Sequence, residues 1–199
     1  MGLESALPPP FLIADHPGLE LLNSVGAPYG TEMDWIGSGT ELLCWCSSVG
    51  LLTDAEADDL QAQLAPDELD DLAKEVRDLR EIYRTFVPGG AQSLIEYLNA
   101  LLARGQATYQ IVSDGDADVP EMVLRARMSG AADLMAVIAR AVADAICLEV
   151  PERTRQCAGP SCTMWFRDTS KSNRRRWCSM SVCGNRSKAA AHRARHSGS

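Results

Sequence analysis

Four cysteines in this sequence have the spacing of metal ligands. They form a C-x4-C pair, fifteen intervening residues and a second C-x4-C pair: Cys157, Cys162, Cys178 and Cys183. Zinc binds four thiolate sulfurs in a tetrahedron, and two short knuckles at the ends of a loop supply them with little chain strain. Gly159 and Pro160 favour the tight turn that the first knuckle requires. The spacing therefore predicts one Zn²⁺ ion per chain, held by these four sulfurs.

Two other roles for these cysteines fit the sequence less well than a four-sulfur zinc site. Two disulfides would need an oxidising compartment that nothing else in the sequence supports. His192 and His196, four residues apart, could replace one cysteine, but four sulfurs already complete the shell. The bulky apolar residues between the outer cysteines are only Met164, Trp165, Phe166, Trp177, Met180 and Val182. Because that core is too small to fold alone, we expect coordination to supply most of the folding free energy, about 10 kcal/mol.

Charge divides the chain at the same place. The formal net charge is -8 over 199 residues. Residues 151–199, called the cysteine module here, hold eleven Lys and Arg and two acidic residues, a charge of +9. Residues 1–150, called the body, hold eight basic and 25 acidic residues, a charge of -17. An acidic body is repelled by polyanions, whereas a compact basic module is drawn toward phosphate; a solvated basic tail is the alternative.

Residues 179–195 have an alanine-rich composition and should form one helix, which carries Cys183 and is anchored by the metal there. Arg186 and Arg193 are seven apart on one face, and Lys188, His192 and Arg195 follow steps of four and three on an adjacent face. Such a basic stripe can grip phosphates or enter the major groove of double-stranded DNA. The nucleic-acid contacts expected from the loop and the helix are Arg174, Arg175, Arg176, Arg186, Lys188, Arg193 and Arg195.

Three other residues of the module have two uses each. The Asn185 amide could contact a base, but within a metal knuckle asparagine more often holds backbone or sulfur, so we predict the structural role. Trp165 and Trp177 are expected to pack the small core. If they stacked on unpaired bases instead, the module would favour single-stranded nucleic acid.

Three short segments make the module recognisable: CGNR at 183–186, RRWCSM at 175–180, and WF at 165–166 behind the first knuckle. Together they closely resemble the CGNR zinc finger of bacterial proteins, over residues 155–195. In that family the finger follows an N-terminal domain called ABATE, and the proteins are regarded as stress-induced transcription regulators. The resemblance implies a zinc-binding, DNA-binding module.

The body resembles the ABATE domain through fewer residues. They are the LELLNSV segment at 19–25, the segment 42–52 with Trp45, and the order of the following helices. The family more often has threonine where this chain has Ser24. No small-molecule site is carried over from the family residue by residue.

Periodicity predicts most of the body to be helical. Thr53 and Glu56 form a capping box, which predicts a helix from residue 54. Pro66 should end that helix and begin a second one, and 88–90 (PGG) should end the second before another helix over 94–102. The apolar face of the second helix consists of Leu69, Leu72, Val76, Leu79, Tyr83 and Phe86.

After these helices the period changes to two. Residues 107–128, around the turn DGD at 114–116, predict a β-hairpin with one packed face and one wet face. A helix over 131–148 is so apolar that it is either central to the core or part of a subunit contact, which would make a homodimer. Pro151 places the domain boundary near 150. The predicted fold is mostly α with a small β-hairpin (α+β): a helical N-terminal domain followed by a small four-cysteine zinc-binding module.

Nothing in the body predicts an enzyme. Asp15 and His16 are adjacent, which is not the geometry of a catalytic triad, and the sequence has no glycine-rich phosphate loop and no H-E-x-x-H motif. Cys44, Cys46 and Cys147 are expected to be small buried hydrophobes. The polar or aromatic groups in or near loops that could contact a small-molecule effector are Asp15, His16, Asn23 and Trp35.

These observations predict a bacterial one-component transcription regulator. Its acidic body (1–150) would sense a signal or dimerise, and its zinc finger (151–199) would bind double-stranded DNA. The body could also fold back on the finger and inhibit it until a ligand binds. No segment has the uninterrupted apolar length of a membrane span, and no secretion signal is visible, so we expect a cytoplasmic protein with no membrane partner. The alternative is a zinc-stabilised protein- or RNA-interaction module that binds no promoter.

Overall fold

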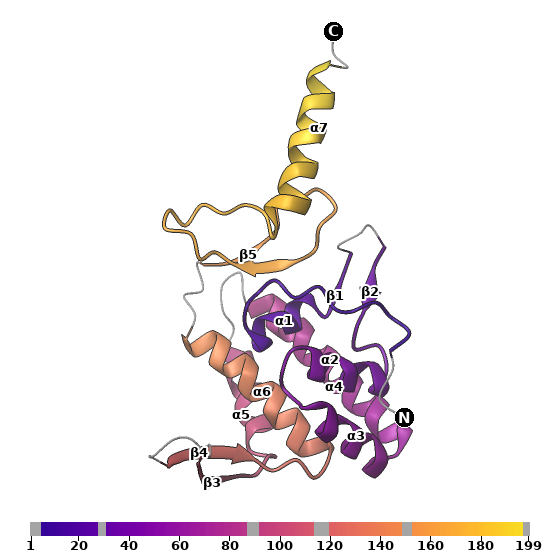
Figure 1. Ribbon diagram of the computed structural model, residues 1–199, viewed down its shortest axis with the longest axis vertical. Helices are drawn as coiled ribbons and strands as arrows, with labels where there is room; N and C mark the ends of the chain where they lie inside the picture. Colours follow the sequence, from indigo (N-terminus) through magenta and orange to yellow (C-terminus); the bar gives the residue numbers. More distant parts are fainter. Residues whose placement is uncertain (1–4, 28–30, 87–91, 114–119, 149–152, 197–199) are drawn as a thin grey trace.

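The computed structural model describes residues 5–27, 31–86, 92–113, 120–148 and 153–196. It shows a helical body with the cysteine module at one end (Figure 1). The helices of the body are α1 (Pro17–Asn23), α2 (Gly39–Ser48), α3 (Asp54–Gln63), α4 (Pro66–Phe86), α5 (Gln92–Leu102) and α6 (Ala131–Leu148). The strands of the body are β1 (Val25–Gly26), β2 (Met33–Asp34), β3 (Ala107–Val112) and β4 (Glu121–Ala126). The predicted mostly-α fold with a small hairpin is confirmed.

Local signals set the ends of α3 and the start of α4. Thr53 caps α3: the Glu56 amide donates to Thr53 Oγ1 at 3.2 Å, and the Thr53 amide donates to Glu56 Oε2 at 2.8 Å. Helix α4 begins at Pro66, where the absent N–H costs no helical hydrogen bond. Its predicted apolar face is buried except for Phe86, which is half-buried. The predicted stop at 88–90 lies outside the described residues.

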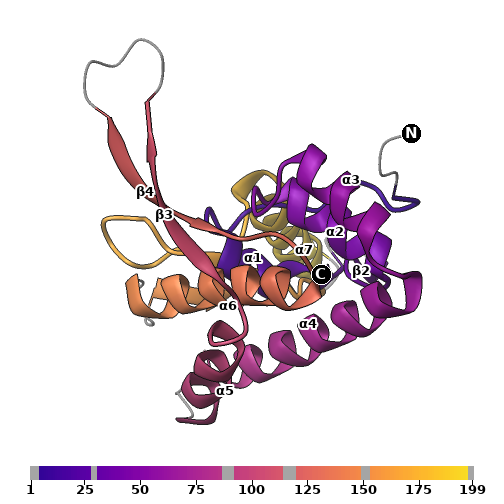
Figure 2. The same ribbon diagram turned by 90° about the horizontal axis from the view of Figure 1, so that it is seen from below.

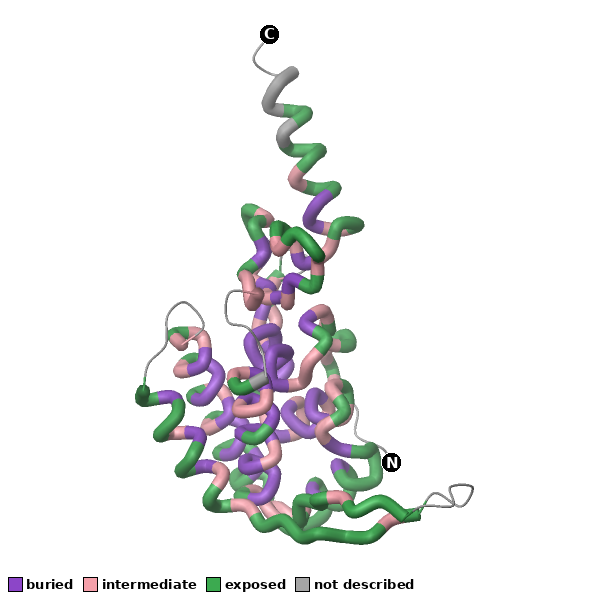
Figure 3. Tube along the Cα trace, turned by 90° about the vertical axis from the view of Figure 1, so that its left-hand side faces the viewer, coloured by how far each residue is buried: buried purple, intermediate pink, exposed green. Residues whose placement is uncertain are grey.

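Helix α6 lies at the centre of the body rather than on its surface. Leu134, Ile138 and Val142 are all buried in the main core, which α1, α4 and α5 complete around it. A methyl group at Gly18 would overlap the Ala141 carbonyl, because α1 and α6 pack with almost no space between their backbones. Of the two alternatives for this apolar helix, the structure shows the central one; Figure 3 shows buried positions concentrated where the helices meet.

The hairpin forms as predicted, but the face that was predicted to be packed is exposed. Strands β3 and β4 pair antiparallel, with Tyr109 opposite Leu124 and Ile111 opposite Met122. These four side chains remain 70%, 43%, 77% and 67% exposed. The prediction of one packed face was wrong, because alternation tells which side chains share a face and not whether another element covers it. Figure 2 shows the hairpin extending beyond the helices.

A buried ion pair joins the short strands of the body to α4. Arg80 donates to Asp34 through Nη1 at 2.9 Å and through Nη2 at 3.0 Å, and its Nη1 also donates to Ser24 Oγ at 3.0 Å. Because Arg80 is almost fully buried, these bonds satisfy a guanidinium that would otherwise be costly to bury. They fix the position of the segment that leads from α1 into β2.

The structure also tests the predictions about the cysteines of the body and about membrane spans. Cys46 is buried and Cys44 is half-buried, but Cys147 is exposed, so the expectation that Cys147 is a buried hydrophobe was wrong. Within the described ranges, no helix combines the length and the apolar character that crossing a bilayer requires.

Candidate metal centre

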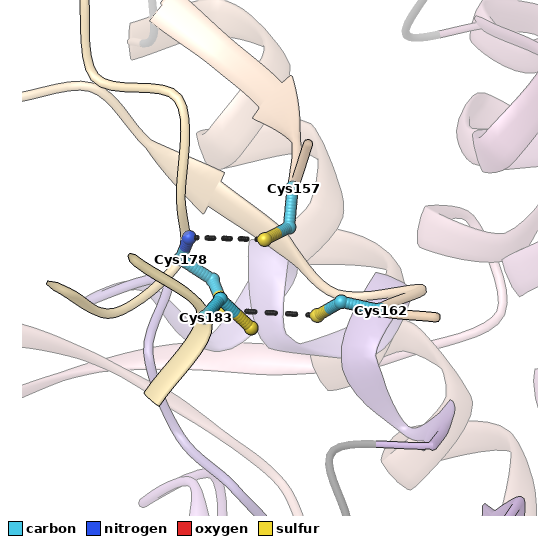
Figure 4. A group of neighbouring side chains, drawn as sticks. All are labelled: Cys157, Cys162, Cys178 and Cys183. Carbon is cyan, nitrogen blue, oxygen red and sulfur yellow. Dashed lines mark hydrogen bonds between the residues drawn. The ribbon is translucent and has the colours of Figure 1, made fainter. Parts of the chain in front are cut away.

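The four predicted ligands come together in the structure. Their sulfurs all lie within 4.8 Å of one another, and all four residues are buried (Figure 4). The first knuckle is the loop of a hairpin formed by β5 (Thr154–Gln156) and β6 (Trp165–Arg167). The second knuckle runs from Cys178 into the π-helical turn η2 (Met180–Gly184), which carries Cys183.

The sulfur separations suit one tetrahedral metal ion. Cys178 Sγ lies 3.7 Å from Cys162 Sγ and 3.6 Å from Cys183 Sγ. Four sulfurs at about 2.3 Å from a zinc ion would be separated by about 3.8 Å along each edge of the tetrahedron. A disulfide needs about 2.05 Å, and all seven cysteines are free in this structure.

The backbone around the sulfurs is shaped for them. The amides of Gly159 and Cys178 point at Cys157 Sγ, at 3.4 and 3.3 Å, and such N–H···S bonds stabilise a thiolate. A methyl group at Gly159 would lie 3.2 Å from Cys162 Cβ and 3.4 Å from Cys183 Sγ, so glycine leaves the room that the sulfurs occupy.

The electrostatics of three of the thiols favour a bound cation. The hydrogen bond from the Cys178 thiol lowers the pKa of Cys162 to about 5. That interaction and burial raise the pKa of Cys178, and burial raises the pKa of Cys183 to about 11. These three sulfurs therefore resist ionising together. A divalent cation removes this conflict, and soft thiolate donors are the set that zinc prefers.

A buried carboxylate and one arginine hold the loop between the knuckles. Asp168, which is fully buried, accepts bonds from the Ser170 amide at 2.9 Å and from the Arg175 amide at 2.8 Å. The Arg175 guanidinium donates to the carbonyls of Trp177 and Cys178 and lies over the Phe166 ring, 4.5 Å from its centre. Sequence reasoning grouped Arg175 with the nucleic-acid contacts; the structure shows its donors bonded inside the module.

The remaining predicted contacts lie on the outside of the module. Arg174 and Arg176 are exposed on the loop, and Arg186, Lys188 and Arg193 are exposed on α7 (Asn185–His196). The side chain of Arg195 lies outside the described part. Helix α7 projects away from the body (Figure 1), so the expectation that the body folds back over this basic surface is not met.

The start of α7 differs from the predicted helix. Sequence reasoning placed Cys183 on one continuous α-helix, whereas the structure places it on the wider π-helical turn that leads into α7. Asn185 donates from Nδ2 to the Ser181 carbonyl at 3.2 Å, which is a contact with backbone and not with sulfur.

The module is attached to the body by an asparagine that sequence reasoning assigned to a ligand site. Asn23 Oδ1 accepts from the Trp165 amide at 2.7 Å, and Asn23 Nδ2 donates to the Trp165 carbonyl at 3.0 Å. Its side chain thus pairs with β6 as a neighbouring strand would. The buried carboxylate of Glu20 accepts a further bond from Asn23 Nδ2 at 2.9 Å, and the Ala27 amide donates to Thr163 Oγ1 at 3.2 Å.

The four predicted effector residues do not form one site. Asp15 is exposed, and Asn23 bonds to the cysteine module. His16 caps α1, where its Nδ1 accepts from the Gly18 amide at 3.1 Å. Trp35 lines a cavity of the body, and the other three residues are not among the residues around it. The residues around that cavity were missed because three separate segments bring them together.

Comparison with known families agrees with the two parts of the chain. The CGNR zinc finger family matches residues 153–196. The ABATE family, described as "Putative stress-induced transcription regulator", matches residues 15–149. A comparison with curated proteins finds no match.

Proposed function

Because this chain belongs to the ABATE family and carries a CGNR zinc finger, we propose that it is a zinc-dependent, one-component transcription regulator that binds double-stranded DNA. The observation that carries the proposal is the exposed basic helix α7, which follows directly from a four-sulfur metal centre and projects away from an acidic body (Figure 1). The family description supports a stress-induced transcription regulator, and we infer further that the protein is bacterial and works in the cytoplasm.

The zinc ion, one per chain, has a structural role in this proposal. Cys157, Cys162, Cys178 and Cys183 would be its ligands. The ion would lock the two knuckles together and so orient α7, which begins two residues after the last ligand. A site of four thiolates has no open position for a substrate, so no enzymatic activity is proposed.

Helix α7 would supply phosphate contacts. Arg186, Lys188 and Arg193 are exposed on it, and Arg195 follows in the sequence. The exposed Arg174 and Arg176 would extend this surface onto the loop, while Arg175 positions the loop through its bonds to backbone carbonyls. Phosphate contacts of this kind give affinity and register, and a helix of this width fits the major groove.

The tryptophans favour a duplex over single strands. Trp165 packs against the core of the body and bonds to Asn23, and Trp177 packs against the core of the module. Both are half-buried, so neither is an open platform on which an unpaired base could stack. The module therefore fits a double-stranded target better than single-stranded DNA or RNA.

Salt-dependent binding of the full-length protein tests this function. Affinity would be measured by fluorescence anisotropy on duplex DNA, single-stranded DNA and RNA between 50 and 200 mM salt. Each lost phosphate contact lowers the slope of log K against log salt by about 0.9 on duplex DNA. We expect duplex DNA to bind best, and the double variant Arg186→Gln/Arg193→Gln to lower the slope by about 1 to 2.

The matched control is Arg140→Gln, which removes an exposed positive charge from helix α6 of the body. It should leave the slope unchanged. A flat slope on all three nucleic acids would refute DNA binding and favour a protein partner, whereas stronger binding to RNA would favour the RNA-interaction alternative.

A further inference from the structure

The body contains a cavity whose walls carry aromatic rings and negative charge. Its volume is about 460 Å³, within the range of small-molecule sites. Trp35 and three segments line it: residues 5–10, called the N-terminal arm here, one face of α2, and the start of α3. Trp35 closes the arm onto the body, because its Nε1 donates to the Pro8 carbonyl at 2.7 Å.

The charges at the cavity have one sign. Glu41 on α2 and Asp54 and Asp58 on α3 all line it, and among the described residues no Lys, Arg or His does. Glu41 is half-buried, while the two aspartates are exposed at its α3 side. Carboxylates on two sides of a concave surface raise the local concentration of cations and repel anions.

Apolar and polar groups complete the lining. Trp35 and Trp45 lie in the wall but are only 3% and 2% exposed, so the accessible apolar surface comes mainly from Leu7, Pro8, Pro9 and Pro10 of the arm. Ser47 and Ser48 of α2 add polar residues to the wall.

We propose that this cavity binds a small organic cation, an ammonium group on an apolar body, with the charge near the three carboxylates and the apolar part against Leu7 and the prolines of the arm, beside the two tryptophans. An anionic or neutral compound of the same shape would lack the electrostatic attraction to the carboxylates. The lining thus identifies the chemical class of the effector.

The arm also reaches the cysteine module. Immediately after the cavity-lining residues 5–10, Phe11 and Ile13 pack against the core of the module. The Ile13 amide donates to Glu20 Oε1 at 2.6 Å, and Glu20 Oε2 accepts from Asn23, the residue that bonds to Trp165. A ligand that shifts the arm therefore acts on the contact that holds the module. This regulatory consequence rests on the proposed DNA-binding function, whereas binding of the cation does not.

Binding is tested on the full-length protein by NMR of the tryptophan indole groups. The chain has four tryptophans, of which Trp35 and Trp45 line the cavity and report on binding there. Three probes of matched size are titrated: 2-phenylethylammonium, 2-phenylethanol and 3-phenylpropionate. We expect saturable shifts of the Trp35 and Trp45 signals with the ammonium, and affinities at least tenfold weaker for the other two. Absence of saturable binding by the ammonium, or equal binding of all three, would overturn the proposal.

Matched charge variants locate the site. Asp54→Asn/Asp58→Asn should weaken the ammonium affinity five- to tenfold. The control Asp59→Asn/Asp71→Asn also removes two exposed negative charges, but neither residue lines the cavity, so its affinity should stay within twofold. Glu41→Gln gives an independent test from the α2 side of the cavity. Equal effects of the two double variants would show that net charge alone attracts the probe, which contradicts a built site.

A second measurement separates binding of the cation from its effect on DNA binding. Saturating 2-phenylethylammonium should change the duplex DNA affinity of the wild-type chain at least threefold. If the chain binds no DNA but the tryptophan signals shift as described, the cation site stands and the regulatory function fails. If DNA binds without any effect of the cation, the connection through the arm is refuted.

Discussion

Replacing Asn23 with alanine should loosen the contact between the body and the cysteine module. The side chain makes three hydrogen bonds, at 2.7 Å and 3.0 Å to the Trp165 backbone and at 2.9 Å to Glu20. Each such bond contributes about 1 kcal/mol net, and the Glu20 oxygen, being buried, would also lose a donor that water cannot easily replace. We therefore expect a loss of about 3 kcal/mol in the free energy of unfolding.

Two measurements on the Asn23→Ala variant check this value. Urea unfolding gives the change in stability, and hydrogen exchange at the Trp165 amide reports on the contact itself. The control is Asn99→Ala, an equivalent truncation on the exposed side of α5, which should change stability by less than about 0.5 kcal/mol. The reasoning is refuted if Asn23→Ala costs less than about 1 kcal/mol and leaves the Trp165 amide as protected as before.

Four further predictions test other parts of the structure. Excess chelator should abolish the dispersed NMR signals of residues 153–196 while those of the body persist; persistence of both sets would contradict a metal-dependent module. Gly18→Ala should destabilise the protein by about 1 to 3 kcal/mol because α1 touches α6 there. Gly130 has open space around it, so Gly130→Ala should change the stability by less than about 1 kcal/mol. Similar losses for the two variants in thermal unfolding would argue against the close helix contact. Ile111→Ala on the exposed hairpin should lower the free energy of unfolding by less than about 0.5 kcal/mol. Ile138→Ala in the core should lower it by about 2 to 5 kcal/mol. A large loss of stability in Ile111→Ala would mean that the hairpin face is covered. Burial raises the pKa of Asp133, but hydrogen bonds from a serine hydroxyl and two backbone amides outweigh burial and hold the pKa below 3.8. The stability difference between wild type and Asp133→Asn should therefore be full at pH 6 and shrink as the pH falls below 3.8. A difference that stays constant with pH in urea unfolding would contradict this.

The elements that could be predicted are those whose signals are local. A capping box at Thr53 and a proline at position 66 mark helix ends because they act on neighbouring backbone groups. The pairing of β3 with β4 was equally readable from alternation, but its exposure was not, since burial depends on what the rest of the chain places nearby. The four cysteines were found because type and spacing together specify a metal site.

The parts that could not be predicted join residues far apart in the sequence. The bonds between Asn23 and Trp165 span 142 residues, and no local pattern distinguishes this asparagine from one that contacts a ligand. Arg175 was grouped with its neighbours because charge alone does not show whether a guanidinium faces solvent or a backbone carbonyl. Trp35 was a reasonable candidate, yet the cavity around it needed the arm and two helices to be placed first.

X-ray absorption at the zinc edge of the purified full-length protein tests the central claim most directly. The four-sulfur centre predicts one zinc ion per chain surrounded by four sulfur atoms at about 2.3 Å, with no nitrogen or oxygen neighbour in the first shell. A protein that is metal-free yet ordered over residues 153–196, or a zinc ion with a nitrogen or oxygen ligand, would contradict the account.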